Sequence, residues 1–237
     1  MSSVLANILI GLATSLITGT SVWLWQRTRS ARVWRRKAAF FGVNPGHPCL
    51  IFLNHHHRSP WTMAHYDIRA LLDVASVVDR LGGQIVVEAA AEFRGTNGDR
   101  TEFCIGGPGA NQRSAGHLAH HLPGIAFRPY SDLPDALAIV VGDRQFLWRR
   151  GEQEYAVVAK FIPQGASRPV FLICGQVGNT NRAAVHFLKR EYRDLTKRLV
   201  SSDRFCLIVR ASATSVYGHE LVALERDVTA EAFAGGT

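Results

Sequence analysis

An uncharged, apolar run followed at once by a basic cluster is the first feature of the chain. Residues 4–25 read VLANILIGLATSLITGTSVWLW, and six cations follow: Arg27, Arg29, Arg32, Arg35, Arg36 and Lys37. A helix of these 22 residues is about 33 Å long, which is enough to cross a hydrocarbon core of about 30 Å. Because the apolar side chains surround the whole helix, a buried helix of a soluble domain is disfavoured. We predict a transmembrane anchor over residues 1–26 and a basic juxtamembrane linker over residues 27–37.

The basic cluster also predicts the orientation of this anchor. Basic residues stay on the cytoplasmic side of a membrane, so residues 38–237 are expected inside and the N-terminus outside. The chain would then be a single-pass protein of the cell membrane with a cytoplasmic C-terminal domain. A cleaved signal peptide is the rival interpretation, but its basic residues would precede a shorter apolar run. The hydroxyls of the run should bond to helix carbonyls: Thr14, Ser15, Thr18, Thr20 and Ser21.

Most of the positive charge of the chain lies in this cluster. The whole sequence has 27 Lys and Arg against 19 Asp and Glu, a formal net charge of +8. Without the six cations of residues 27–37, 21 Lys and Arg remain against 19 Asp and Glu, a net charge of +2. A nucleic-acid-binding domain would carry a basic stripe of its own, whereas cations beside an apolar run contact anionic lipid head groups. We therefore predict membrane lipid, and not nucleic acid, as a partner.

Residues 38–237 have the pattern of one α/β domain, which the charge bias predicts to be cytosolic. A buried strand at 49–54, a helix at 64–81 and a strand at 84–88 form a unit that is typical of a parallel sheet. Further strands are expected at 102–105, 137–141, 155–161, 169–174, 203–211 and 220–225, and helices at 113–121 and 181–200. A turn at Gly142 and Asp143 predicts an antiparallel excursion between 137–141 and 155–161, and residues 232–237 should form a loose tail. Because the strands are apolar without alternation, we predict a three-layer sandwich with a mostly parallel mixed sheet.

Two segments share a glycine-rich loop between a strand and a helix. FCIGGPGANQRSAGHL at 103–118 and FLICGQVGNTNRAAVHFL at 171–188 each pass from a buried strand through Gly and Asn to Arg. Glycine allows close approach of the backbone, the start of a helix attracts anions, and ligands of open sheets bind at the carboxyl ends of strands. The loops therefore predict a phosphate or carboxylate site. The candidate ligand-binding residues in them are Gly106, Gly107, Asn111, Arg113, Gly175, Gly178, Asn179 and Thr180.

The glycine loops match neither GxGxxG nor the Walker A pattern GxxxxGK[ST], so two structural turns are the alternative. With GGPGAN at 106–111 and a second glycine-rich helix start, the chain resembles a set of uncharacterised membrane-anchored bacterial α/β proteins with a GGPxxN strand-to-helix loop. The resemblance covers the two loops and their strands, and it implies a nucleotide-like small molecule as the ligand. The second loop, CGQVGNTNRAA, departs from a Gly-Thr-Ala pattern by its Asn residues.

Other candidate site residues lie near the first two strands. Asn54 ends the first strand and His55 follows it, so both would line a pocket at the carboxyl end of this strand. Asp67 at the start of a helix and Glu88 at the end of a strand are candidate catalytic residues, because a carboxylate there would contact ribose hydroxyls or act as an acid or base. The alternative for Asp67 is a favourable charge at a helix N-terminus.

Cysteine and histidine patterns predict no metal site and no cofactor. His117 and His121 have the i, i+4 spacing of zinc ligands, but neither a third ligand nor an HExxH motif accompanies them. The cysteines lie in apolar runs without CxxC spacing, which predicts buried free thiols in a reducing cytosol, with a bridge between strands as the alternative. They are Cys49, Cys104, Cys174 and Cys206.

Together these features predict a membrane-anchored cytosolic domain that binds a nucleotide or nucleotide derivative and acts as a sensor or signalling effector. One alternative is a hydrolase or glycosyl-transfer enzyme that acts on a nucleotide in the same pocket. The other is a structural or partner-docking module with no ligand. The residues leave open whether the chain forms a homo-oligomer.

Overall fold

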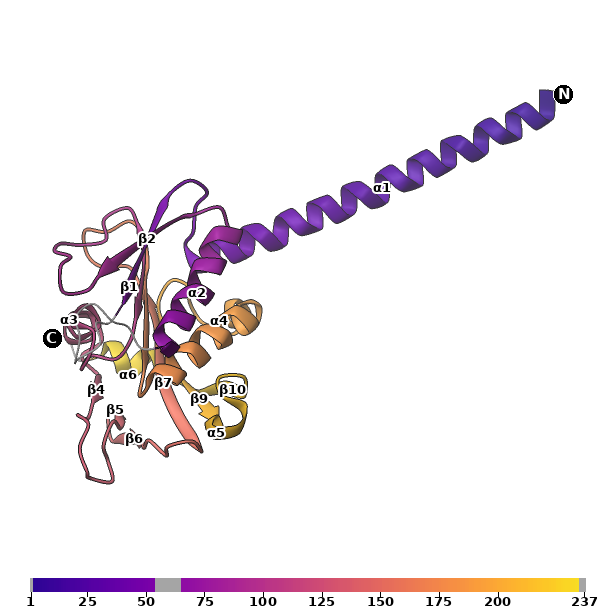
Figure 1. Ribbon diagram of the computed structural model, residues 1–237. Helices are drawn as coiled ribbons and strands as arrows, with labels where there is room; N and C mark the ends of the chain where they lie inside the picture. Colours follow the sequence, from indigo (N-terminus) through magenta and orange to yellow (C-terminus); the bar gives the residue numbers. More distant parts are fainter. Residues whose placement is uncertain (1, 54–64, 235–237) are drawn as a thin grey trace. The chain divides into compact units, whose positions relative to one another are not determined.

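The computed structural model describes residues 2–53 and 65–234, which belong to two compact units, Met1–Ala39 and Phe40–Thr237. Most of helix α1 (Ser2–Phe41) makes up the first unit (Figure 1). Residues 27–37, expected as a linker, are part of this helix. Among the helices in the described part of the chain, none has the length and mean hydropathy needed to cross a membrane.

Hydroxyl groups along α1 bond back to the helix, as predicted. Ser15 Oγ donates to Gly11 O at 2.8 Å, and Thr20 Oγ1 donates to Leu16 O at 2.7 Å. In the same way Thr14 Oγ1 donates to Gly11 O, and Thr18 Oγ1 donates to Thr14 O. These polar side chains are therefore satisfied within the helix itself.

The second unit contains a mixed sheet of seven strands in the order β10-β9-β7-β8-β3-β1-β2 (Figure 1). The strands are β1 (Pro48–Leu53), β2 (Gln84–Ala89), β3 (Thr101–Ile105), β7 (Gln153–Phe161), β8 (Val170–Gly175), β9 (Phe205–Ser212) and β10 (Val222–Asp227). Neighbours from β8 to β2 are parallel, and the predicted strand-helix-strand unit is confirmed by the pairing of β1 with β2. Neighbours from β10 to β8 are antiparallel. The sheet, which was expected to be mostly parallel, is therefore parallel at one end and antiparallel at the other. Strands β7 and β8 are antiparallel because the connection 162–169 between them is too short for a crossover.

Helices cover both faces of this sheet. On one face α2 (His65–Arg80) packs against α4 (Gly178–Arg198). On the other face Leu118 of α3 (Gln112–His121) and Ala232 of α6 (Thr229–Phe233) pack in a core with Leu50 and Leu172 of the sheet. Burial from both sides explains why the central strands are apolar throughout. A short helix, α5 (Thr214–Tyr217), connects β9 and β10.

A small second sheet lies between α3 and β7 in the chain. Its strands are β4 (Ile125–Phe127), β5 (Ile139–Val141) and β6 (Arg144–Phe146), all antiparallel. Gly142, with φ of +60°, and Asp143 form the β5–β6 turn. The expected strand at 137–141 therefore pairs with β4 and β6 rather than with β7, because a two-residue turn brings the next three residues beside it.

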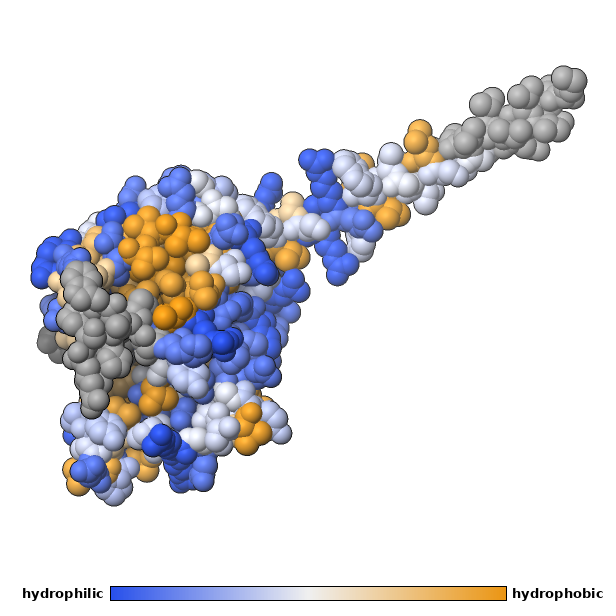
Figure 2. Space-filling model, in the orientation of Figure 1, coloured by the Kyte–Doolittle hydropathy of each residue, from blue (hydrophilic) through white to orange (hydrophobic). Residues whose placement is uncertain are grey.

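Strand β2 marks the limit of the covered sheet. It is an edge strand, and its Ile85 and Val87 are 42% and 51% exposed. Ile68 and Leu72 of α2 are also exposed, and Figure 2 shows hydrophobic side chains gathered where β2 lies in Figure 1. The apolar strands predict a sheet that helices cover on both faces. This prediction holds for the central strands but not for the edge strand β2.

Candidate functional site

The two glycine-rich loops lie side by side. Their strands β3 and β8 are parallel neighbours, with Ile105 opposite Ile173. Gly106 N donates to Ile173 O at 2.8 Å, and Cys174 Sγ donates to Gly106 O at 3.2 Å. A Cβ atom on Gly107 would lie only 3.2 Å from Gly175 O, so the approach of the two loops favours glycine at this position.

The chain leaves these loops in opposite directions. The loop after β3 leads into α3 on one face, and the loop after β8 leads into α4 on the other face. Adjacent parallel strands whose helices cover opposite faces leave a crevice at their carboxyl ends. This arrangement places the candidate site at the usual ligand-binding position of an open α/β sheet.

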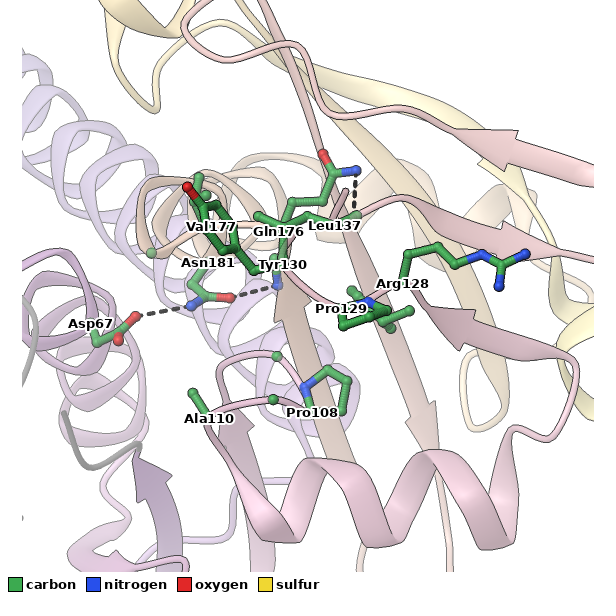
Figure 3. Close-up of a pocket in the computed structure, with 15 residues that line it drawn as sticks. Asp67, Pro108, Ala110, Arg128, Pro129, Tyr130, Leu137, Gln176, Val177 and Asn181 are labelled. Carbon is green, nitrogen blue, oxygen red and sulfur yellow. Dashed lines mark hydrogen bonds between the residues drawn. The ribbon is translucent and has the colours of Figure 1, made fainter. Parts of the chain in front are cut away.

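A pocket of about 650 Å³ occupies this position (Figure 3). It is lined by residues 107–110, 127–130 and 175–178, with Asp67, Leu137 and Asn181. The first and third ranges are the two glycine loops, and Asp67 comes from α2. Residues 127–130 and 137 belong to the end of β4 and to the connection from β4 to β5. The volume lies within the range of pockets that hold small-molecule ligands.

A chain of hydrogen bonds crosses the pocket wall from α2 to β8. Asn181 Oδ1 accepts from Gly175 N at 2.6 Å, and Asn181 Nδ2 donates to Asp67 Oδ1 at 2.9 Å (Figure 3). Both side chains are buried, with 4% of Asp67 and 3% of Asn181 exposed. Because Asn181 bonds to backbone on one side and carboxylate on the other, its amide orientation is determined and the Asp67 carboxylate is held in place.

Gln176 connects the second glycine loop to the small sheet. Its Oε1 accepts from Tyr155 N at 2.8 Å, and its Nε2 donates to Leu137 O at 3.1 Å and to Phe146 O at 2.8 Å. Leu137 has a φ of +58°, which is rare for a residue other than glycine. Residues 127–130 and 137 thus form a pocket wall that one buried glutamine attaches to β8.

Some of the predicted ligand-binding residues serve the loops themselves. Asn111 begins α3 by accepting from Arg113 N and Ser114 N, and it donates to Ile105 O at 3.0 Å. Thr180 Oγ1 accepts from Val177 N at 3.1 Å and donates to Val177 O at 2.7 Å. Both side chains are buried and neither lines the pocket, nor does Asn179, although Gly107, Gly175 and Gly178 do. Gly106, with φ of +116°, lies directly before the lining residues.

Arg113 pairs with a buried carboxylate instead of facing the pocket. Its Nε and Nη2 donate to the two oxygens of Glu102 at 2.7 and 2.6 Å, and His117 Nε2 lies 2.6 Å from Glu102 Oε1. Burial by itself would raise the pKa of Glu102, but the hydrogen bonds and charges of Arg113 and His117 outweigh it and lower the pKa to about 2. Arg113 therefore ties the start of α3 to β3, and it does not line the pocket.

Glu102, Cys104 and His117 bring together oxygen, sulfur and nitrogen atoms within 4.8 Å of one another. Such a donor set suits zinc. However, the Glu102 oxygens already accept from Arg113, whose positive charge opposes a second cation at this place. His121 lies beside His117, with ring centroids 5.8 Å apart.

The remaining candidates lie away from the pocket or outside the described residues. Glu88 follows Val87 in the edge strand β2 and does not line the pocket. Asn54 and His55 lie outside the described residues. The four cysteines are buried and free, as predicted, and burial raises the pKa of Cys49 to about 11 and of Cys174 to about 12. These thiols are not nucleophiles at neutral pH.

The sequence pattern did not reveal several residues of the pocket. Gln176 and Asn181 stand within the second loop, but their roles depend on partners in α2, β7 and the small sheet. Arg128, Tyr130 and Leu137 belong to an irregular segment without a motif. Comparison with protein-family models, curated proteins and solved structures finds no match to this chain.

Proposed function

We propose that residues 38–237 bind a nucleotide or a nucleotide derivative in this pocket and act as a sensor or signalling effector. The observation that carries the proposal is the convergence of both glycine loops, at the carboxyl ends of adjacent parallel strands, on one pocket of about 650 Å³. The crevice itself follows from the strand order. Glycine-rich backbone on both of its sides supports binding of a single ligand by both loops.

The chemistry of the lining matches the parts of a nucleotide. Backbone amides of the glycine loops suit phosphate oxygens, and the buried Asp67 and Asn181 suit hydroxyl or base groups. Phe127 and the exposed ring of Tyr130 offer apolar surface on the opposite wall. A ligand with separate anionic, polar and aromatic parts therefore fits better than a purely apolar one.

Thermal unfolding of the full-length protein with a panel of nucleotides tests this proposal. A ligand at 100 times its Kd adds about 2.7 kcal/mol, which raises the melting temperature of a chain of this size by about 5–10 °C. Gly107→Ala should weaken the effect, because the new Cβ lies 3.2 Å from Gly175 O. Gly116→Ala in α3 is the matched control, since its Cβ meets no atom within 4 Å. No stabilisation by any nucleotide would contradict the proposal.

We further propose that residues 4–25 anchor the protein in the cell membrane as a single pass, with the domain in the cytoplasm. The apolar run, the basic residues of 27–37 and the hydroxyls bonded within the helix support it. We expect the protein to resist carbonate extraction and its domain to be digested by protease only when the inner face is accessible. A variant with Arg35, Arg36 and Lys37 replaced by Glu should insert less efficiently or in mixed orientation. Release by carbonate would refute the anchor.

A hydrolase or glycosyl-transfer activity in the same pocket is the second candidate. The buried carboxylate of Asp67, held by Asn181 at the pocket wall, favours it, because acid or base catalysis needs such a positioned group. Incubation of each bound nucleotide with the protein and analysis of the products by chromatography distinguish the two functions. Turnover that Asp67→Asn abolishes supports the enzyme, and binding without turnover supports the sensor.

A further inference from the structure

The two glycine loops differ in electrostatic character. Gly178 is the first residue of α4, and a Cβ atom on it would lie 3.4 Å from Asp67 Oδ1. The Asp67 carboxylate therefore lies at the first turn of α4, where the positive end of the helix dipole stabilises an anion. A phosphate at this turn would be repelled by Asp67. The start of α4 is thus not the phosphate subsite that two equivalent loops predict.

The loop after β3 has the opposite character. Among the described residues, the amides of Gly107 and Gly109 donate to no acceptor, whereas those of Ala110 and Asn111 bond to Gly107 O. Free amides that line a pocket are donors for an anion. Figure 3 shows Pro108 and Ala110 on this loop and Asp67 on α2, so the amides and the carboxylate come from different elements. The pocket therefore has an amide side that accepts negative charge and a carboxylate side that repels it.

We propose that the ligand is a ribonucleotide whose cis-diol hydroxyls donate to Asp67 while its phosphate binds the amides of the loop 107–110. A carboxylate can accept hydrogen bonds from both hydroxyls of a diol at once, and the bond from Asn181 Nδ2 at 2.9 Å fixes the orientation of the carboxylate. Asp67 is then the residue that selects ribonucleotides over 2′-deoxyribonucleotides. This inference rests on the proposed nucleotide-binding function and adds the sugar specificity to it.

Calorimetric titration of the full-length protein with the four ribonucleoside diphosphates and their 2′-deoxy counterparts tests the inference directly. We expect the ribonucleotide to bind at least about tenfold more tightly, because the deoxy ligand leaves one charge-assisted hydrogen bond unmade. Equal affinities would overturn the role of Asp67 but leave the nucleotide-binding function in place. No binding by either series would overturn both.

Two variants connect the preference to the carboxylate. Asp67→Asn should reduce the ribonucleotide preference to less than about threefold, and it should also increase the affinity for inorganic pyrophosphate, because a negative charge near the anion is lost. Asp73→Asn is the matched control: it removes a charge from the same helix, but Asp73 pairs with Arg182 and Lys189 outside the pocket, so both quantities should stay unchanged. An unchanged preference in Asp67→Asn would overturn the inference. If Asp67→Asn does not fold, the affinities of the unaltered protein for ribonucleotides and 2′-deoxyribonucleotides decide the question.

Discussion

At the scale of single residues, position in the fold determines which polar side chains are available to a ligand. Asn111 and Thr180 are turned toward backbone of their own loops, and Arg113 toward Glu102. Asp67 and Asn181 are as deeply buried but form part of the pocket wall. Residue type and spacing do not distinguish these cases, because a helix cap and a ligand contact use the same amide and hydroxyl groups.

The buried Glu102 predicts a stability change at acid pH. Its lowered pKa of about 2, against an ordinary value of 4.5, means that the folded state favours the charged form. The stabilisation is present above about pH 4.5, amounts to about 3 kcal/mol, and is lost as the pH falls toward 2. Urea unfolding between pH 2 and 7 should show this slope, and Glu102→Gln should reduce both the slope and the stability at pH 7, since Arg113 then lacks its anion. Equal slopes in both proteins would contradict this prediction.

At the scale of elements, apolar periodicity located the main strands and helices well. The helices expected at 64–81 and 113–121 correspond to α2 and α3, and the strand expected at 169–174 corresponds to β8. The short elements β4, β6 and α6 were not predicted. Elements of three to five residues depend on contacts from elsewhere: α6, for instance, is held where Gly124 N donates to Ala232 O at 3.1 Å. A local pattern is too weak to specify such elements.

The second glycine loop predicts a clear steric effect at the start of α4. A Cβ atom on Gly175 would collide with Thr180 Oγ1 and lie 2.7 Å from Asn181 N. Gly175→Ala should therefore destabilise the protein by about 1–3 kcal/mol, measured by urea unfolding. Gly116→Ala, in the middle of α3 with open space around it, should stabilise by about 0.5–1 kcal/mol. Equal effects of the two substitutions would show that the loop tolerates a side chain.

At the scale of the whole domain, the pocket depends on the attachment of the small sheet to the main sheet. Gln176 supplies this attachment through its bonds to Tyr155, Leu137 and Phe146. Residues 127–130 lie before β5 in the chain and form the pocket wall that the bonds of Gln176 support. Loss of the glutamine should therefore affect a wall that lies far from it in the sequence.

Gln176→Leu should loosen the small sheet and weaken ligand binding together. The apolar side chain leaves Tyr155 N, Leu137 O and Phe146 O without the partner that Gln176 provides, so amide hydrogen exchange in residues 125–146 should accelerate and nucleotide affinity should fall about tenfold. The control is Gln145→Leu, at an exposed position of β6. Fast exchange in the control as well, or unchanged exchange in Gln176→Leu, would argue against this role.

The sequence by itself determined the α/β class, the buried strands and the existence of two glycine-rich turns, because apolar period and glycine are local signals. Only the tertiary structure decided that these turns adjoin, that their helices leave on opposite faces, and that Asp67 from a distant helix occupies the start of α4. It also placed Gln176 and Asn181 in the pocket wall and Arg113 on Glu102. The reason is that strand order and the pairing of buried polar groups depend on contacts between residues far apart in the chain, which no local pattern encodes.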